Sequence, residues 1–227
     1  MQRKTGKTAR PETRAADRRG ALRDALVDAA ERTIRTHGLA GLSARDLARE
    51  VGCALGAIYN VFPDLDAIVY AANGRTLAAI EAVIAGRRRR ALAKRAGRND
   101  AVAELVDLAE TYLEFATTNQ VRWRALFEHR RPTPIAAPGW YSAELRRLFA
   151  FVEEPLAALR PDLADQERQL LARTMFSAVH GVVSLGLEEK LVSVPVAKLK
   201  DQVSALVAAL CRGMLRAPDA RKTRRVR

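Results

Sequence analysis

Two short helical segments separated by a tight turn constrain the fold more than any other feature of this sequence. Ser43 begins the first segment and is followed three residues later by Asp46, which is the form of a capping box with Asp in place of the usual Glu. Gly52 ends this segment, because glycine tolerates the backbone angles that a turn requires. The second segment runs from about Ala54 to Phe62. Two short helices at this spacing have the form of a helix-turn-helix.

The sequence predicts a longer helix on each side of this pair. The first runs from about Gly20 to His37, and Gly38 is suited to end it in a left-handed conformation. Its apolar residues recur at helical spacing and form one stripe: Leu22, Leu26, Ala29, Ala30 and Ile34. After Pro63, Asp64 can cap a long helix that ends in a run of arginines.

Helical periodicity continues through the second half of the chain. It predicts helices at about 100–118, 121–130, 141–159, 164–190 and 196–214. Ala and Leu, both strong helix formers, supply 69 of the 227 residues, and only 5% of residues are aromatic, which argues against an all-β sandwich or barrel. The expected fold is therefore all-α.

The net charge of +13 is concentrated in three segments. Residues 1–20 hold seven Lys or Arg against two acids, residues 87–98 hold seven against none, and residues 216–227 hold six against one. A near-neutral body with three basic patches suggests a polyanionic partner, most simply nucleic acid. The alternative is that the termini are solvated and that residues 87–98 are an exposed helix end.

The second short segment is suited to enter a DNA groove. Its first residues, 54–57, are small or uncharged, so a helix there can approach the floor of a major groove about 12 Å wide. Ile58, Val61 and Phe62 can turn inward and anchor it, while Tyr59 and Asn60 remain as polar side chains for reading DNA.

Residues 20–77 resemble the N-terminal DNA-binding domain of the TetR family of transcriptional regulators, and the matching stretch is residues 41–66. The resemblance implies that Ser43 and Arg45 contact phosphates. It also places a set of residues on the groove-facing helix: Ala54, Leu55, Gly56, Ala57, Tyr59 and Asn60. Arg18 and Arg19 of the basic arm complete the predicted DNA-binding set.

Two positions depart from the family pattern. Leu65 stands where the family often has Lys, and Val61 stands where it often has His or Tyr. Both usual residues help to hold phosphates, so the grip on the DNA backbone is expected to rely more on Tyr59, Arg45 and the basic arm.

The second half resembles a subgroup of the same family whose ligand domain carries a Trp/His/Gly signature. The segments concerned are 112–116, 123–129 and 175–181. The resemblance implies a helical domain that binds an effector and dimerises, with its last two helices forming a four-helix bundle with a second subunit. The multi-sided apolar helix at 164–190 and the clean apolar stripe of 196–214 favour the same interface.

Six residues are the candidates for a ligand pocket: Trp123, Phe127, Trp140, Tyr141, Phe176 and His180. Taken one by one, each of these aromatic residues fits a core position, but pockets are mostly apolar with few polar groups, so together they are the best candidates. His180 fits either a core or interface position or a pocket, and His129, beside charged residues, is expected at the surface.

Other classes of protein lack support in the sequence. The three histidines lie far apart, so no zinc site is expected, and no hydrolase, Walker or dinucleotide motif is present, so neither catalysis nor a cofactor is expected. Cys53 and Cys211 cannot form a disulfide framework, and Cys53 is either a small buried residue or a redox sensor. Neither a signal peptide nor a membrane-length apolar run is recognised, which favours the cytoplasm.

These patterns predict four regions. Residues 1–19 form a disordered basic arm, 20–66 a helix-turn-helix DNA-binding domain, 67–215 a helical effector-binding and dimerisation domain, and 216–227 a basic tail. The expected function is that of a ligand-responsive transcriptional regulator, a repressor that binds a pseudo-palindromic double-stranded operator as a homodimer. The alternative is an architectural DNA-binding protein that uses its basic arms without sequence specificity.

Overall fold

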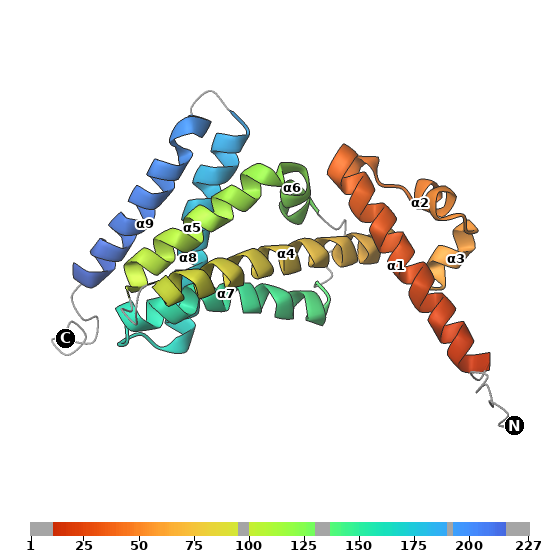
Figure 1. Cartoon of the computed structure of the whole chain (residues 1–227), viewed down its shortest axis with the longest axis horizontal. Helices are drawn as coiled ribbons and strands as arrows, with labels where there is room; N and C mark the ends of the chain where they lie inside the picture. The colour runs from red at the N-terminus through yellow and green to blue at the C-terminus, as the bar shows by residue number, and fades with distance from the viewer. Residues whose placement is uncertain (1–10, 95–99, 130–136, 190–192, 217–227) are drawn as a thin grey trace, which may run out of the picture. The chain divides into compact units, whose positions relative to one another are not determined.

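The computed structural model describes residues 11–94, 100–129, 137–189 and 193–216, and this part of the chain is helical with no strand (Figure 1). The predicted all-α class is confirmed. The helices are α1 Pro11–His37, α2 Ala44–Val51, α3 Leu55–Tyr59, α4 Leu65–Lys94, α5 Ala101–Thr118, α6 Gln120–Glu128, α7 Gly139–Leu159, α8 Asp165–Leu187 and α9 Leu199–Arg216.

The chain divides into two compact units. The first comprises Met1–Arg75 and Arg124–Ile135, and the second comprises Thr76–Trp123 and Ala136–Arg227. The division therefore falls inside α4 and α6, nine residues beyond the domain boundary expected after residue 66. The end of α6 belongs to the first unit, although the sequence pattern placed all of it in the second.

The first unit packs α1, α2 and α3 around one apolar core. The stripe predicted for α1 supplies Leu26, Ala29, Ala30 and Ile34, all buried, and the helix-turn-helix adds further buried residues: Leu47, Ala48, Ile58 and Phe62. Burying a leucine or isoleucine side chain is worth about 1.5–3 kcal/mol, so this core orients the short helices despite their length.

Helix α1 begins at Pro11, so the start expected at Gly20 is wrong. Proline is favoured in the first helical turn, where its missing N–H is not needed, and the Arg and Ala residues that follow are strong helix formers. The predicted disorder thus does not extend over residues 11–19, and the rest of that arm lies outside the described residues.

The predicted caps of the helix-turn-helix are confirmed. The Ser43 hydroxyl accepts from the Asp46 backbone N–H at 3.2 Å, and Gly52 ends α2 in the left-handed region at φ 74°. Asp64 accepts from the Ala67 backbone N–H at 2.7 Å at the start of α4. Helix α3 ends at Tyr59, earlier than expected. The backbone N–H groups of Val61 and Phe62 both donate to the backbone oxygen of Ile58, and Pro63 follows them.

The end of α6 is held against α4 within the first unit. The buried side chain of Asn73 donates to the backbone oxygen of Ala125 at 3.1 Å. His129 Nε2 lies 2.8 Å from a carboxylate oxygen of Asp66, and its ring packs edge-on against Tyr70. The side chain of His129 is only 10% exposed, so its expected surface position is wrong.

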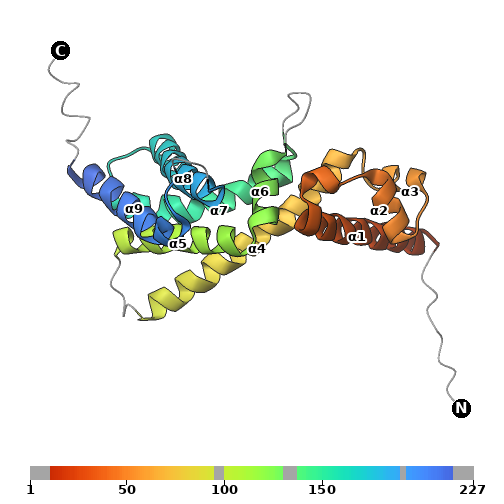
Figure 2. The same ribbon diagram turned by 90° about the horizontal axis from the view of Figure 1, so that it is seen from above.

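The second unit is a helical bundle in which α5 packs against α7, α8 and α9 (Figure 2). Its core is formed by buried residues from all of these helices, among them Leu105, Leu113, Leu156, Val179, Val183, Val203 and Val207. Helices α8 and α9 approach closely at Gly186, where an added Cβ would lie 2.4 Å from a methyl carbon of Leu199.

By length and composition alone, two of the described helices could cross a membrane. They are the Leu65–Ala91 part of α4 and the whole of α8. Neither is recognised as an apolar run in the sequence, because polar and charged residues interrupt both. Half of the apolar stretch in α4 is already buried within the chain, as in the core helix of a soluble protein. Helix α8 leaves more of its apolar surface exposed.

Candidate functional site

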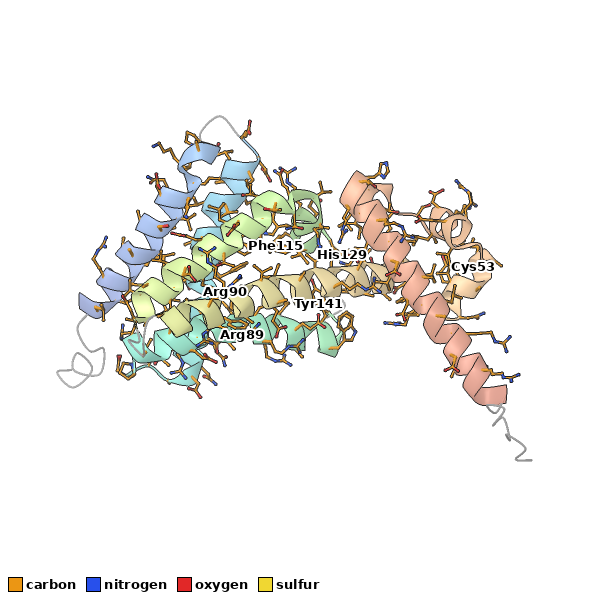
Figure 3. All side chains as sticks on the ribbon, in the orientation of Figure 1. Cys53, Arg89, Arg90, Phe115, His129 and Tyr141 are labelled. Atoms are coloured by element: carbon orange, nitrogen blue, oxygen red, sulfur yellow. The ribbon has the colours of Figure 1, made fainter. Side chains whose placement is uncertain are left out.

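The helix-turn-helix presents an exposed and uncharged surface at α3. Leu55 is 40% exposed and Tyr59 is 53% exposed, and Gly56 and Asn60 are exposed beside them, whereas Ile58 is buried. This is the orientation that the sequence predicts, with the anchoring side chains inward and the reading side chains outward. Cys53, half-buried in the turn before α3, lies next to this surface (Figure 3).

The hydroxyl of Ser43 is already engaged in capping α2. Its hydroxyl donates to the Asp46 carboxylate as well as accepting from the Asp46 backbone, and Arg49 pairs with the same carboxylate at 2.6 Å. The hydrogen bond from Ser43, followed by the charge of Arg49, lowers the pKa of Asp46 below its usual value. Arg45 is exposed on the same helix, so it is the more available of the two predicted phosphate contacts.

Three arginines connect helices through residues that lie far apart in the sequence. The Arg23 guanidinium lies 4.4 Å from the ring centroid of Phe62, which joins α1 to the segment after α3. Arg32 pairs with Glu50 of α2 at 2.7 Å, and Arg75 of α4 pairs with Asp28 of α1. The sequence carries no local signal for these two ion pairs, because their partners lie 18 and 47 residues apart.

The predicted DNA-binding residues Arg18 and Arg19 are exposed on α1. Arg18 Nε donates to the backbone oxygen of Arg14 at 3.1 Å, which is a contact within its own helix. Both guanidinium groups are therefore carried on an ordered helix rather than on a disordered arm.

The first half of the arginine run is paired within the second unit. Arg87 lies 3.0 Å from Asp107 and 2.7 Å from Glu114, both on α5. Arg88 lies 2.6 Å from Glu104 of α5 and 2.5 Å from Glu154 of α7. The interpretation of this run as a free basic patch is therefore wrong for its first two residues.

Arg89 and Arg90, the next two residues of the run, are exposed on α4 (Figure 3). The side chains at 94, 95 and 98 lie outside those that the structure describes, as does the basic tail after residue 216.

Three of the six predicted ligand residues meet in one cluster. Trp123 Nε1 donates to the Tyr112 hydroxyl at 2.9 Å, and that hydroxyl lies 2.8 Å from His180 Nδ1. The Phe176 ring stacks on His180 with centroids 5.5 Å apart. Burial lowers the pKa of His180, which favours the neutral imidazole at this contact.

The other three predicted residues do not join this cluster. Trp140 and Tyr141 pack edge to face at the start of α7, with Trp140 exposed and Tyr141 buried, and Phe127 is exposed near the end of α6 in the first unit. Tyr112, which links the cluster, was not among the predicted ligand residues. The sequence pointed to Tyr112 only through its position in segment 112–116, one of the three segments that resemble the family subgroup.

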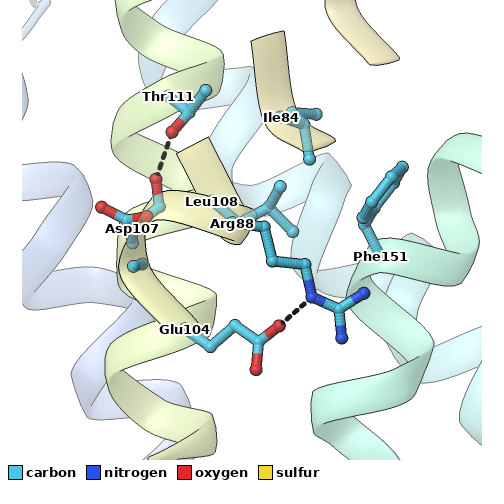
Figure 4. A pocket seen from close by; sticks show the side chains of 8 residues that line it. Ile84, Arg88, Glu104, Asp107, Leu108, Thr111 and Phe151 are labelled. Atoms are coloured by element: carbon cyan, nitrogen blue, oxygen red, sulfur yellow. Dashed lines mark hydrogen bonds and ion pairs between the residues drawn. The ribbon is translucent and has the colours of Figure 1, made fainter. Parts of the chain in front are cut away.

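A small cavity opens elsewhere in the second unit, between α4, α5 and α7 (Figure 4). Its volume is about 20 Å³, room for about one water molecule. The predicted ligand residues do not line it. Its lining is formed by Ile84, Arg88, Ala91, Glu104, Asp107, Leu108, Thr111 and Phe151.

Among the described residues, no group of His, Cys, Asp and Glu is arranged to hold a metal ion.

Two sequence models of known domains match the chain. The model described as bacterial regulatory proteins of the tetR family matches residues 26–72, and the model described as tetracyclin repressor-like, C-terminal domain matches residues 105–210. No curated protein sequence matches the chain significantly.

Solved structures share the fold. A protein of unknown function from Rhodococcus sp. RHA1 is 23% identical, with a TM-score of 0.62 over 83% of this chain and 94% of that one. RolR in complex with resorcinol is 14% identical, with a TM-score of 0.60 over 90% and 97%. A TetR-family transcriptional regulator from Bordetella parapertussis 12822 is 20% identical, with a TM-score of 0.53 over 84% and 93%.

The two matching regions cover the helix-turn-helix of the first unit and most of the bundle of the second. The chain therefore belongs to the TetR family of transcriptional regulators.

Proposed function

We propose that this protein is a ligand-responsive repressor that binds a pseudo-palindromic operator as a homodimer in the cytoplasm, and that it has no catalytic role. The observation that carries the proposal is the exposed, uncharged surface of α3, fixed to the core by Ile58 and Phe62. A helix of this kind can enter the major groove, where base edges are distinguishable.

The proposed contacts to DNA fall into two classes. Arg18, Arg19 and Arg45 are exposed cations suited to phosphates, which set the register on the duplex without carrying sequence information. Residues 54–57 and Asn60 face the bases, and Tyr59 contacts the backbone. Ser43 contributes mainly by capping α2, because its hydroxyl is already engaged by Asp46.

The selection of bound duplexes from a random pool tests this function. We expect enrichment of a motif with two-fold symmetry, because a dimer presents two copies of α3. Binding without any enriched motif would support the architectural alternative, in which basic segments hold DNA of any sequence.

The homodimer is proposed to form through α8 and α9. Helix α8 carries Leu170 and Leu185, both more than half exposed, and Gly181 between them, where an added Cβ would meet no atom within 4 Å. An apolar helix with this much exposed surface requires a partner to bury it. Covering it with a second copy fits the multi-sided apolar pattern of the helix.

Leu185→Arg tests the interface without disturbing the monomer core, since Leu185 is 52% exposed. We expect the variant to sediment as a monomer at micromolar concentration where the wild type sediments as a dimer, because the interface would bury an unpaired charge. Val83→Arg, at another exposed apolar position, is the control and should remain dimeric. A monomeric wild type would contradict the proposal.

A small molecule bound in the second unit is proposed to shift the affinity for DNA by favouring one of two conformations. The aromatic cluster of Tyr112, Trp123, Phe176 and His180 supports a ligand that stacks on rings. RolR, which shares the fold, binds resorcinol, so resorcinol is the first probe. In a Trp140→Phe variant the fluorescence of the single remaining Trp123 should change on binding, and unchanged emission at saturating probe would exclude this ligand.

A further inference from the structure

The surface of α3 carries an exposed leucine that the fold of its own unit does not use. Among the described leucines of the first unit, Leu55 alone is exposed, at 40%, while the others are buried or half-buried. A single exposed leucine is common on protein surfaces and needs no explanation by itself. The glycine beside it, however, is also not required by the fold.

Gly56 follows Leu55 in α3, and neither the backbone conformation nor the packing of its own unit requires glycine at this position. Its φ is not positive, and an added Cβ would meet no atom within 4 Å. Glycine lowers the stability of a helix relative to alanine, so the fold alone would favour alanine here. A bare Cα on an exposed helix leaves space for something outside the chain to approach the backbone.

The chemistry of this surface restricts what can be read from DNA. Ala54, Leu55 and Ala57 have neither donors nor acceptors in their side chains. In the major groove each base pair presents hydrogen-bonding groups, and thymine also presents its C5-methyl group. Apolar side chains can distinguish only the methyl group, so the side chains of residues 54–57 cannot recognise guanine, cytosine or adenine by hydrogen bonds.

We propose that Leu55 recognises a thymine methyl in each operator half-site, and that Gly56 lets α3 come close enough for this contact. The inference rests on the proposed DNA-binding function and adds its specificity. Tyr59 and Asn60, one turn further along, supply the polar contacts that the first turn lacks.

Uracil tests the proposal, because it lacks only the methyl group of thymine. An operator selected from a random duplex pool is resynthesised with uracil at each thymine in turn, and the dissociation constant is measured for each duplex. We expect a single uracil, at the contacted thymine of one half-site, to weaken binding about fourfold, the value for one buried methyl group.

Leu55→Ala identifies the side chain responsible. In this variant the same thymine-to-uracil change should have no further effect on binding, while wild type and the Val83→Ala control retain the fourfold difference. Equal loss in wild type and Leu55→Ala would overturn the assignment to Leu55. Binding that is insensitive to uracil at every position would overturn methyl recognition but leave the proposed DNA-binding function standing, whereas failure to bind any duplex would overturn both.

Gly56→Ala separates folding from recognition. We expect a higher thermal midpoint, because alanine favours the helix, together with at least tenfold weaker binding to the selected operator. A variant that binds as well as wild type would show that the bare Cα is not needed for the approach, and would overturn that part of the proposal.

Discussion

The arginine run of α4 and the exposed surface of α3 differ both in composition and in what their side chains contact. The run at Arg87–Arg90 is the densest positive charge in the sequence, yet its first two guanidinium groups face carboxylates of α5 and α7. The α3 surface holds no charge and leaves its reading side chains exposed. In the second unit these charges are neutralised internally, while the first unit leaves its functional surface open to a partner.

Positive charge in a sequence indicates a binding surface only where the fold leaves that charge unpaired. A cation marks a binding surface only when no carboxylate of the same chain reaches it. No carboxylate among the described residues pairs with Arg18 or Arg19 of α1, so both remain candidates for phosphate contact, whereas Arg87 and Arg88 do not. Changes in the paired arginines should therefore affect stability, and changes in the exposed ones should affect DNA binding.

The largest effect is expected when the paired arginines are removed. Arg88→Met leaves the Glu104 carboxylate, only 13% exposed, without its cation, and we expect it to lower the free energy of unfolding by about 2 kcal/mol, below the roughly 3–5 kcal/mol typical of fully buried pairs. Urea unfolding measures this decrease. Arg89→Met, at an exposed position, should change stability by no more than about 0.5 kcal/mol. Equal effects would contradict the comparison.

Neutralising the exposed arginines of α1 should weaken DNA binding and leave the stability of the fold almost unchanged. We expect Arg18→Gln with Arg19→Gln to weaken operator binding by about tenfold, about 1.4 kcal/mol, with little effect on stability. The slope of log affinity against log salt should become shallower by about 0.9 for each phosphate that the variant no longer neutralises. Arg89→Gln with Arg90→Gln removes the same charge elsewhere and is the control. An unchanged slope for the α1 pair would show that these residues do not contact DNA.

The sequence predicts the helix-turn-helix well because its determinants are local. The cap at Ser43, the left-handed turn at Gly52 and the cap at Asp64 each act within a few residues, so their consequences can be read without the rest of the fold. The inward position of Ile58 and Phe62 follows from helical spacing in the same way.

The sequence does not predict contacts whose partners lie far apart in the chain. Arg87 meets Asp107 only because α4 and α5 pack together, and His129 is covered because Asp66, 63 residues earlier, lies against it. Of the predicted ligand residues, Trp123 and His180 meet through Tyr112, whereas Phe127 falls in another unit. Aromatic composition identifies candidates for such a cluster, but only packing decides which of them meet.

A smaller effect is expected from the buried polar cluster of the second unit. Burial lowers the pKa of His180 in the folded chain below its unfolded value near 6.5. The unfolded chain therefore binds the proton first, so stability is full above about pH 6.5 and falls as the pH drops toward the lowered pKa. Between about pH 7 and pH 5 the urea midpoint of wild type should fall more than that of His180→Asn. Parallel pH profiles would mean that His180 is not desolvated as described.

The smallest effect is expected at the hydroxyl of Tyr59, on the exposed surface of α3. This side chain is 53% exposed, so Tyr59→Phe should leave thermal stability unchanged. If the hydroxyl donates to a phosphate, its removal should weaken binding by about 1 kcal/mol, roughly fivefold. The decrease should be the same on the selected operator and on its single-base variants, because a phosphate contact carries no sequence information. Titration of the variant against this set of duplexes measures both quantities. A decrease confined to particular bases would place Tyr59 at a base edge, where it would read DNA together with Leu55 and Asn60.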